Sequence, residues 1–154
     1  NDIIVVPFVL DRDLALTKLG FRTSASGDNQ CQLGIYNSDS HGRPTTLISG
    51  SAINAGVTSG GSSGLQFGTY SSALNLSKHT LYYAAIINTT DGNTIGITVV
   101  NDTAPSVFHF SGSSDIHAQC IFLSNIGFGT LPSTLDLTGT VLDSQSCAIF
   151  FAEH

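Results

Sequence analysis

Few residues of this 154-residue chain could do chemistry, and their spacing matches no familiar catalytic arrangement. A glycosidase of the usual kind needs two carboxylates, one of them with a raised pKa. The only Glu here is Glu153, and the Asp residues stand mostly beside Asn, Ser, Gly or Thr, as turn residues do. Nucleophilic catalysis needs a Ser or Cys near a His, and no G-x-S-x-G motif occurs. We therefore expect a protein that binds something and is not an enzyme.

The sequence also predicts no metal and no cofactor. Its five His residues show neither HExxH nor HxH spacing. One zinc arrangement can be drawn, with His109 and His117 meeting across a hairpin, and it is the minor alternative to the prediction of no metal. The Gly-rich stretch 55–64 lacks the Lys and the following helix of a phosphate-binding loop.

Three cysteines, Cys31, Cys120 and Cys147, lie in apolar, strand-like stretches without CxxC spacing. Such cysteines usually behave as small buried hydrophobes, and an odd number argues against a pure disulfide framework. We predict that all three are reduced and buried, in a chain that folds in a reducing cytoplasm.

Charge excludes several classes of partner. Charged residues make up 10% of the chain, against roughly 25% in an average soluble protein. The net charge is -6, and the five Lys and Arg are scattered, so neither nucleic acid nor an anionic membrane is expected as a partner. No apolar run approaches the roughly 20 residues of a spanning helix. The apolar stretch 3–10 follows Asp2 without a basic segment, so we expect neither membrane insertion nor a signal peptide.

The polar surface must come from Ser, Thr and Gly, which disfavour helices. Short apolar or alternating runs recur between turn signals, which predicts a single all-β domain over 1–154 with little or no helix: an antiparallel β-sandwich, and specifically a jelly roll. The stretch 80–88 (TLYYAAIIN) is apolar on both faces and predicts a central strand covered on both sides. Pro7 interrupts 3–10 and predicts an edge strand there.

Two turns hold aromatic, charged and amide groups that the core does not obviously need. The first lies in 37–44 (NSDSHGRP), and the second, 89–93 (TTDGN), contains the Asp-Gly signal of a hairpin. Ligands are commonly bound by such loops. The predicted ligand-binding residues are Tyr36, Asp39, His41 and Arg43 around the first turn, and Asn88, Asp91 and Asn93 around the second.

Two segments, 31–51 (CQLGIYNSDSHGRPTTLISGS) and 74–86 (LNLSKHTLYYAAI), resemble jelly-roll domains of bacteriophage tail fibres and related bacterial surface proteins. The resemblance implies a receptor-binding tip or head domain in the virion tail fibre, a homotrimer that attaches to a bacterial surface glycan or outer-surface protein. Asn1 does not look like a natural start, so we expect the C-terminal fragment of a longer fibre protein.

Three other functions remain open at this point. One is a carbohydrate-binding module of a secreted or cell-surface bacterial protein. Another is a structural decoration or assembly domain of a virion. The last is a glycan esterase or lyase, against which the missing carboxylate pair and nucleophile already count. Solution mass separates a trimeric fibre tip from a monomeric module, and a glycan array separates either from a structural domain.

The residues themselves also give a reason to expect a trimer. Gly34, Gly96 and Thr98 are small and alternate with apolar residues, so they predict a flat face that another subunit could approach closely. Phe150 and Phe151 are adjacent in a strand-like run and should point to opposite faces. Because a two-layer sandwich buries only one face of each sheet, one of the two is expected at a subunit interface.

Overall fold

The computed structural model describes residues 3–23, 29–57, 64–89, 99–100, 120–123, 129–138, 141–143, 147–148 and 150–153. These residues form strands and turns without any helix, which confirms the predicted all-β class. Consequently, no helix that could span a membrane is present in this part of the chain. The strands are β1 (Ile3–Val9), β2 (Leu14–Thr23), β3 (Asn29–Ser38), β4 (Pro44–Leu47), β5 (Ile53–Val57), β6 (Gly64–Leu76), β7 (Leu81–Asn88), β8 (Val99–Val100), β9 (Cys120–Leu123), β10 (Val141–Asp143), β11 (Cys147–Ala148) and β12 (Phe150–Glu153).

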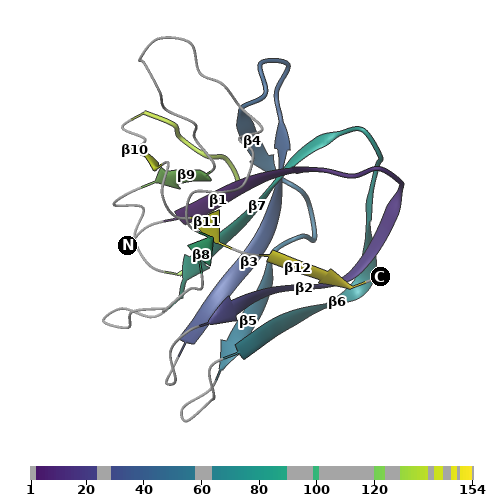
Figure 1. The fold of residues 1–154 in the computed structure, drawn as a ribbon, viewed down its shortest axis with the longest axis vertical. Coiled ribbons are helices and arrows are strands. Elements are labelled where there is room, and N and C mark those ends of the chain that lie inside the picture. The colour runs from purple at the N-terminus through teal and green to yellow at the C-terminus, as the bar shows by residue number, and fades with distance from the viewer. Residues whose placement is uncertain are drawn as a thin grey trace.

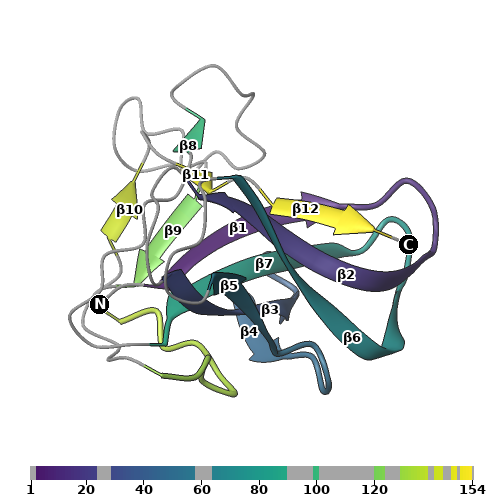
Figure 2. The same cartoon turned by 90° about the horizontal axis from the view of Figure 1, so that it is seen from below.

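The strands pair antiparallel in two main sheets (Figure 1). The larger sheet has the order β10-β9-β1-β7-β3-β4, and β5 also pairs with β3. The smaller sheet has the order β12-β2-β6, and β8 pairs separately with β11. Figure 2 shows the smaller sheet lying as a second layer against β1, β7 and β3. The antiparallel sandwich predicted from the sequence is therefore confirmed.

The pairing is nested: β1 pairs with β7, β2 with β6, and β3 with β5. A long two-stranded ribbon folded over on itself produces this order, and strand pairs then alternate between the two layers. Such nesting is what a jelly roll requires of its outer strands. It also gathers the connections between strands at the two ends of the sandwich.

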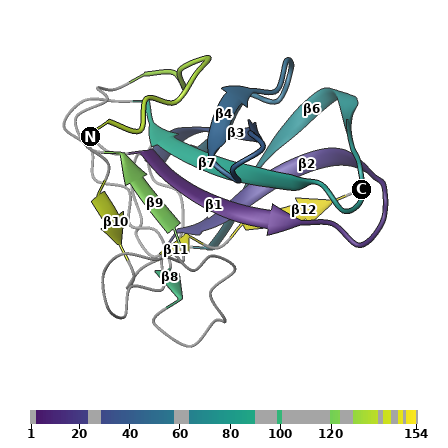
Figure 3. The same cartoon turned by 90° about the horizontal axis from the view of Figure 1, so that it is seen from above.

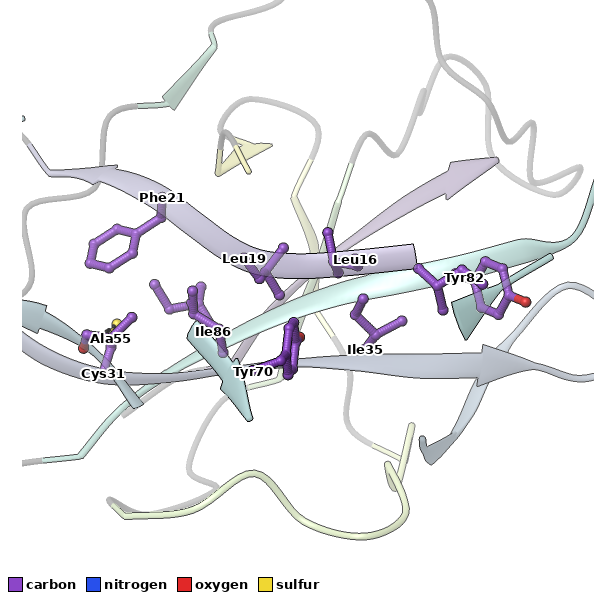
Figure 4. Packing of buried hydrophobic residues seen from close by; sticks show 11 residues of the cluster. Leu16, Leu19, Phe21, Cys31, Ile35, Ala55, Tyr70, Tyr82 and Ile86 are labelled. Carbon is purple, nitrogen blue, oxygen red and sulfur yellow. Dashed lines mark hydrogen bonds between the residues drawn. The ribbon is translucent and has the colours of Figure 1, made fainter. Parts of the chain in front are cut away.

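Strand β7 lies in the middle of the larger sheet, and its residues Tyr82 to Ile87 are all buried. One face of the strand packs into the core between the sheets, as Figure 4 shows for Tyr82 and Ile86 among residues of β2, β3 and β6. Its other face packs against β1, β9 and the segment 129–138. The prediction of a strand covered on both sides is confirmed, although the sheet is antiparallel.

The segment 129–138 covers the outer face of the larger sheet through Leu131 and Leu135. A Cβ atom added to Gly34 would lie 2.6 Å from Leu131 Cδ1 and 2.9 Å from Leu47 Cδ1. Gly34 is thus small because its own chain packs over it. The prediction that Gly34 presents a flat face to another subunit is wrong, while Gly96 and Thr98 lie outside the described residues.

A β-bulge reverses which residues of β2 face the core. Leu16 is buried before the register shift between Leu16 and Lys18, whereas Leu19 and Phe21 are buried after it. An extra residue in one strand changes the alternation of faces. Leu14 and Leu16 therefore share a face with each other but not with Leu19 and Phe21 through simple alternation.

Only the second half of β1, from Pro7 onward, lacks a second paired strand among the described residues. Ile3, Ile4 and Val5 pair with β9, so the first half of the strand is internal. From Pro7 onward, pairing within the described residues is with β7 alone. The prediction of an edge strand is wrong for the first half, and Pro7 falls where no second neighbour needs its missing N–H.

Candidate ligand-binding surface

The turn 39–43 connects β3 to β4 and is held by one carboxylate. Asp39 Oδ1 accepts hydrogen bonds from the backbone N–H groups of His41 and Arg43, each at 2.8 Å. Two backbone bonds, Asp39 N to Arg43 O and Gly42 N to Asp39 O, close the loop. The amide of Arg43, and then that of His41, holds the pKa of Asp39 below its ordinary value. The side chains of His41 and Arg43 are left exposed to solvent.

The sheet fixes this turn through Tyr83. Its ring is buried on β7, and its hydroxyl donates to the carbonyl oxygen of Gly42. Burial, with a smaller contribution from the negative charge of Asp39, raises the pKa of Tyr83 to about 12. The hydroxyl therefore stays protonated at neutral pH and keeps donating to the turn. Gly42 has a φ of 74°, in the left-handed region that favours glycine.

Two further turns, 10–13 and 77–80, are joined to each other by hydrogen bonds. Lys78 N donates to Asp13 Oδ1 at 2.8 Å, and His79 N donates to Leu10 O at 2.8 Å. His79 has a φ of 56° and is the one non-glycine residue with a positive φ in the described ranges. A His held in this conformation is uncommon and costs conformational energy.

The β1–β2 and β6–β7 turns lie together at one end of the sandwich, and β3 runs toward the same end before the turn 39–43. Phe8 and Asn37 both pair with Tyr82, so β1 and β3 end where β7 begins. Figure 3 shows the β1–β2 and β6–β7 connections together at the right of the molecule. We call the surface formed by residues 10–13, 39–43 and 77–80 the turn end. It holds three of the five Lys and Arg residues, namely Arg12, Arg43 and Lys78.

The turn end exposes three cations, and two of its three carboxylates accept hydrogen bonds from the backbone. Asp13 and Asp39 accept backbone hydrogen bonds, while Arg12, Arg43 and Lys78 are exposed. In a chain with so few charges, the clustering of charged residues in these turns could have been noticed in the sequence. The motif Asp11-Arg12-Asp13 has three consecutive charged residues, and sequence reasoning overlooked it.

Tyr36 does not belong to this surface. Its side chain is fully buried in β3, and its hydroxyl donates to Pro132 O at 2.6 Å. The prediction that Tyr36 is an exposed ligand-binding residue is wrong, because residues 129–138 close over the face of β3 to which it points. Tyr36 instead fastens that segment to the sheet.

The second predicted turn lies elsewhere. Asn88 pairs with Cys31 near the start of β3, whereas the turn 39–43 follows the end of that strand. Seven residues of extended chain, at about 3.3 Å each, separate the two positions. Asn88 and the turn 39–43 therefore lie at opposite ends of the sandwich and do not form one site. Asp91 and Asn93 lie outside the described residues.

Near Asn88, a pocket of about 360 Å³ opens where β3, β5 and β6 meet. Its polar lining residues are Gln30, Asn54 and Thr89. Thr89 Oγ1 donates to Gln30 O at 3.0 Å, and Asn54 Oδ1 accepts from Gln32 Nε2 at 3.3 Å. Amides and hydroxyls of this kind suit uncharged ligands, but sequence reasoning singled out none of these residues.

The described residues offer little reactive chemistry. Among them, no group of three His, Cys, Asp or Glu side chains is placed to hold a metal ion. Cys31 is fully buried, its Sγ donates to Ala55 O at 3.3 Å, and burial raises its pKa to about 12. A thiol in this state is a poor nucleophile. The predicted burial of Cys31 is confirmed. The side chains of Cys120 and Cys147 are not among those described, so their predicted burial stays a prediction. His109 and His117 lie outside the described residues.

Comparisons with protein families, with curated proteins and with solved structures find no match for this chain.

Proposed function

We propose that this chain is a non-catalytic receptor-binding domain of a bacteriophage tail fibre and attaches to a glycan on the bacterial surface. The observation that carries the proposal is the turn end: three well-fixed turns that present exposed cationic and imidazole side chains on a chain otherwise poor in charge. Binding residues are commonly placed on loops held by a rigid scaffold.

The fixed geometry of the turns favours binding. Asp39 orders the first turn internally, Tyr83 fastens it to the sheet, and Asp13 joins the other two turns. A surface that is ordered before the ligand arrives loses less conformational entropy on binding. Uncharged polar residues such as Ser and Thr are abundant in the sequence and suit hydrogen bonds to sugar hydroxyls. The phage context is proposed from the resemblance of residues 31–51 and 74–86.

The experiment measures adsorption of labelled protein to a panel of bacterial strains and to their isolated surface polysaccharides. The triple variant His41→Ala/Arg43→Ala/Lys78→Ala removes exposed side chains and leaves the backbone bonds of the turns in place. Loss of one charged hydrogen bond, at about 1.5–3 kcal/mol, corresponds to at least about tenfold weaker binding. We expect at least that loss.

Arg22→Ala is the matched control, because Arg22 is an exposed cation of β2 far from the turn end and pairs with Leu65. It should adsorb like the wild type. If the triple variant also adsorbs like the wild type, the turn end is not the binding surface. If wild-type protein binds no strain and no polysaccharide, the receptor-binding function itself is contradicted and a structural virion domain is favoured.

A further inference from the structure

A depression of about 400 Å³ lies at the edge of the turn end, where β2 begins and β6 ends. Ala15 pairs with Asn75 and Leu14 with Leu76 across these strands. Its lining residues are Asp13, Leu14, Ala15, Asn75, Leu76 and Ser77.

The alternation of side chains places the depression on the outer face of the smaller sheet. Leu14 and Leu76 belong to the packing between the sheets, so Ala15 and Asn75 point outward, and both are exposed. Asp13 precedes β2 and Ser77 follows β6; both also line the depression and are exposed. The lining therefore combines a methyl group with a carboxylate, an amide and a hydroxyl.

Hydrogen bonds to the backbone hold two sides of the depression in place. Asp13 Oδ1 accepts from Lys78 N at 2.8 Å, which orients the carboxylate. Ser77 N donates to Tyr82 Oη at 3.0 Å, so the buried ring of Tyr82 positions the other strand end. The Asp13 carboxylate and the Ser77 backbone are therefore ordered without a ligand.

We propose that this depression binds one neutral hexopyranose unit of a surface glycan. A carboxylate accepts hydrogen bonds from sugar hydroxyls, while an amide both donates and accepts them. The Ala15 methyl group offers a small apolar contact for a C–H face of the ring. Asp13 is the only charged residue in the lining, since Arg12 and Lys78 lie nearby but outside it, and its carboxylate makes a neutral sugar a better fit than an acidic one. This inference rests on the proposed function and names the sugar class that its glycan contains.

The test is a titration of the whole chain with methyl glycosides of glucose, galactose, mannose, rhamnose and N-acetylglucosamine, followed by amide NMR. At least one glycoside should shift the side-chain amide of Asn75 and the backbone amides of residues 13–15 and 75–77, with saturation. Saturable shifts confined to other residues overturn the proposal. It is also overturned if none of the five methyl glycosides binds saturably.

Two variants sharpen the test. Ala15→Leu fills the depression, and Asp13→Asn removes the charge while keeping an acceptor for Lys78 N. Each should weaken glycoside binding by at least about tenfold, as loss of a charged hydrogen bond or of access would. Ala52→Leu, at an exposed alanine before β5, is the control and should bind like the wild type. Unchanged binding by Asp13→Asn overturns the proposal, even if Ala15→Leu fails to fold.

The two proposals fail in different ways. If wild-type protein adsorbs to bacteria but binds no glycoside in the depression, only the sugar site is wrong. If it adsorbs to no cell and no polysaccharide, the proposed function is wrong too. The residues altered here, Asp13 and Ala15, are absent from the triple variant of the adsorption experiment.

Discussion

The four tyrosines of this chain act alike at the level of single residues. Tyr36, Tyr70, Tyr82 and Tyr83 are buried, and each hydroxyl bonds to the backbone of a connection between strands. Buried tyrosine hydroxyls need a hydrogen-bond partner, and here the partners are Pro132 O, Ser51 O, Ser77 N and Gly42 O. The rings fill the core while the hydroxyls fix the loops. The tyrosine hydroxyls, which could otherwise bind a ligand, are therefore already engaged in hydrogen bonds within the chain.

Asp39 should make stability depend on pH. Backbone amides, first that of Arg43, lower its pKa in the folded protein below the ordinary 3.8. The stabilisation is therefore complete above the unfolded-state pKa and is lost as the pH falls through the lower folded-state pKa. Asp39→Asn has no carboxylate to titrate. The difference in free energy of unfolding between wild type and Asp39→Asn should be largest near pH 7 and shrink below pH 3.8. Denaturant titrations at several pH values measure it, and a difference that grows on acidification would contradict this role.

Cys31 should be unreactive in the native protein. Its thiol is buried, and its pKa is raised to about 12 by that burial, so almost no thiolate exists at neutral pH. Labelling with iodoacetamide, followed by mass spectrometry of the peptide that contains Cys31, should show modification only after denaturant is added. Rapid labelling of Cys31 in native buffer would show that the thiol is accessible.

At the level of elements, the sequence predicted what local patterns determine. The apolar run 80–88 identified β7 as a central strand, and the polar run 37–44 identified the turn 39–43. The prediction from sequence failed where a segment distant in the chain determines whether a residue is buried. Tyr36 alternates with the core residue Ile35 and so looked exposed, but its face is covered by a segment 96 residues further along the chain. No local pattern in 31–38 reveals that cover.

The glycines Gly34 in β3 and Gly68 in β6 have different close neighbours, so their substitution by alanine should reduce stability by different amounts. A Cβ atom on Gly68 would lie 2.8 Å from the backbone oxygen Asn54 O, whereas on Gly34 its nearest neighbours are the side-chain ends of Leu131 and Leu47. Backbone cannot move as readily as a leucine methyl group. Gly68→Ala should therefore lower the free energy of unfolding by about 1–3 kcal/mol, the usual cost of overpacking, and Gly34→Ala by less. Chemical denaturation compares them, and the opposite order would contradict the close approach of β5 to β6.

At the level of the whole molecule, the homotrimer remains a prediction that has lost part of its support. The face around Gly34 is covered by its own chain, so an interface must lie elsewhere. Light scattering at micromolar concentration should give the mass of three chains, and Phe150→Asp should dissociate them. A mass near the 16.1 kDa of one chain would refute the trimer and favour a monomeric carbohydrate-binding module.

The central claim is that the receptor binds at the turn end and not at the opposite end of the sandwich. The turn end holds Asp39, His41 and Arg43, whereas the opposite end holds Asn88 and the pocket lined by Gln30 and Asn54. The most direct measurement is amide NMR of the labelled chain, titrated with surface polysaccharide from a strain that it adsorbs to. We predict saturable shifts of the amide signals of residues 10–13, 39–43 and 77–80. Shifts confined to residues 30, 54 and 88–89 would contradict it.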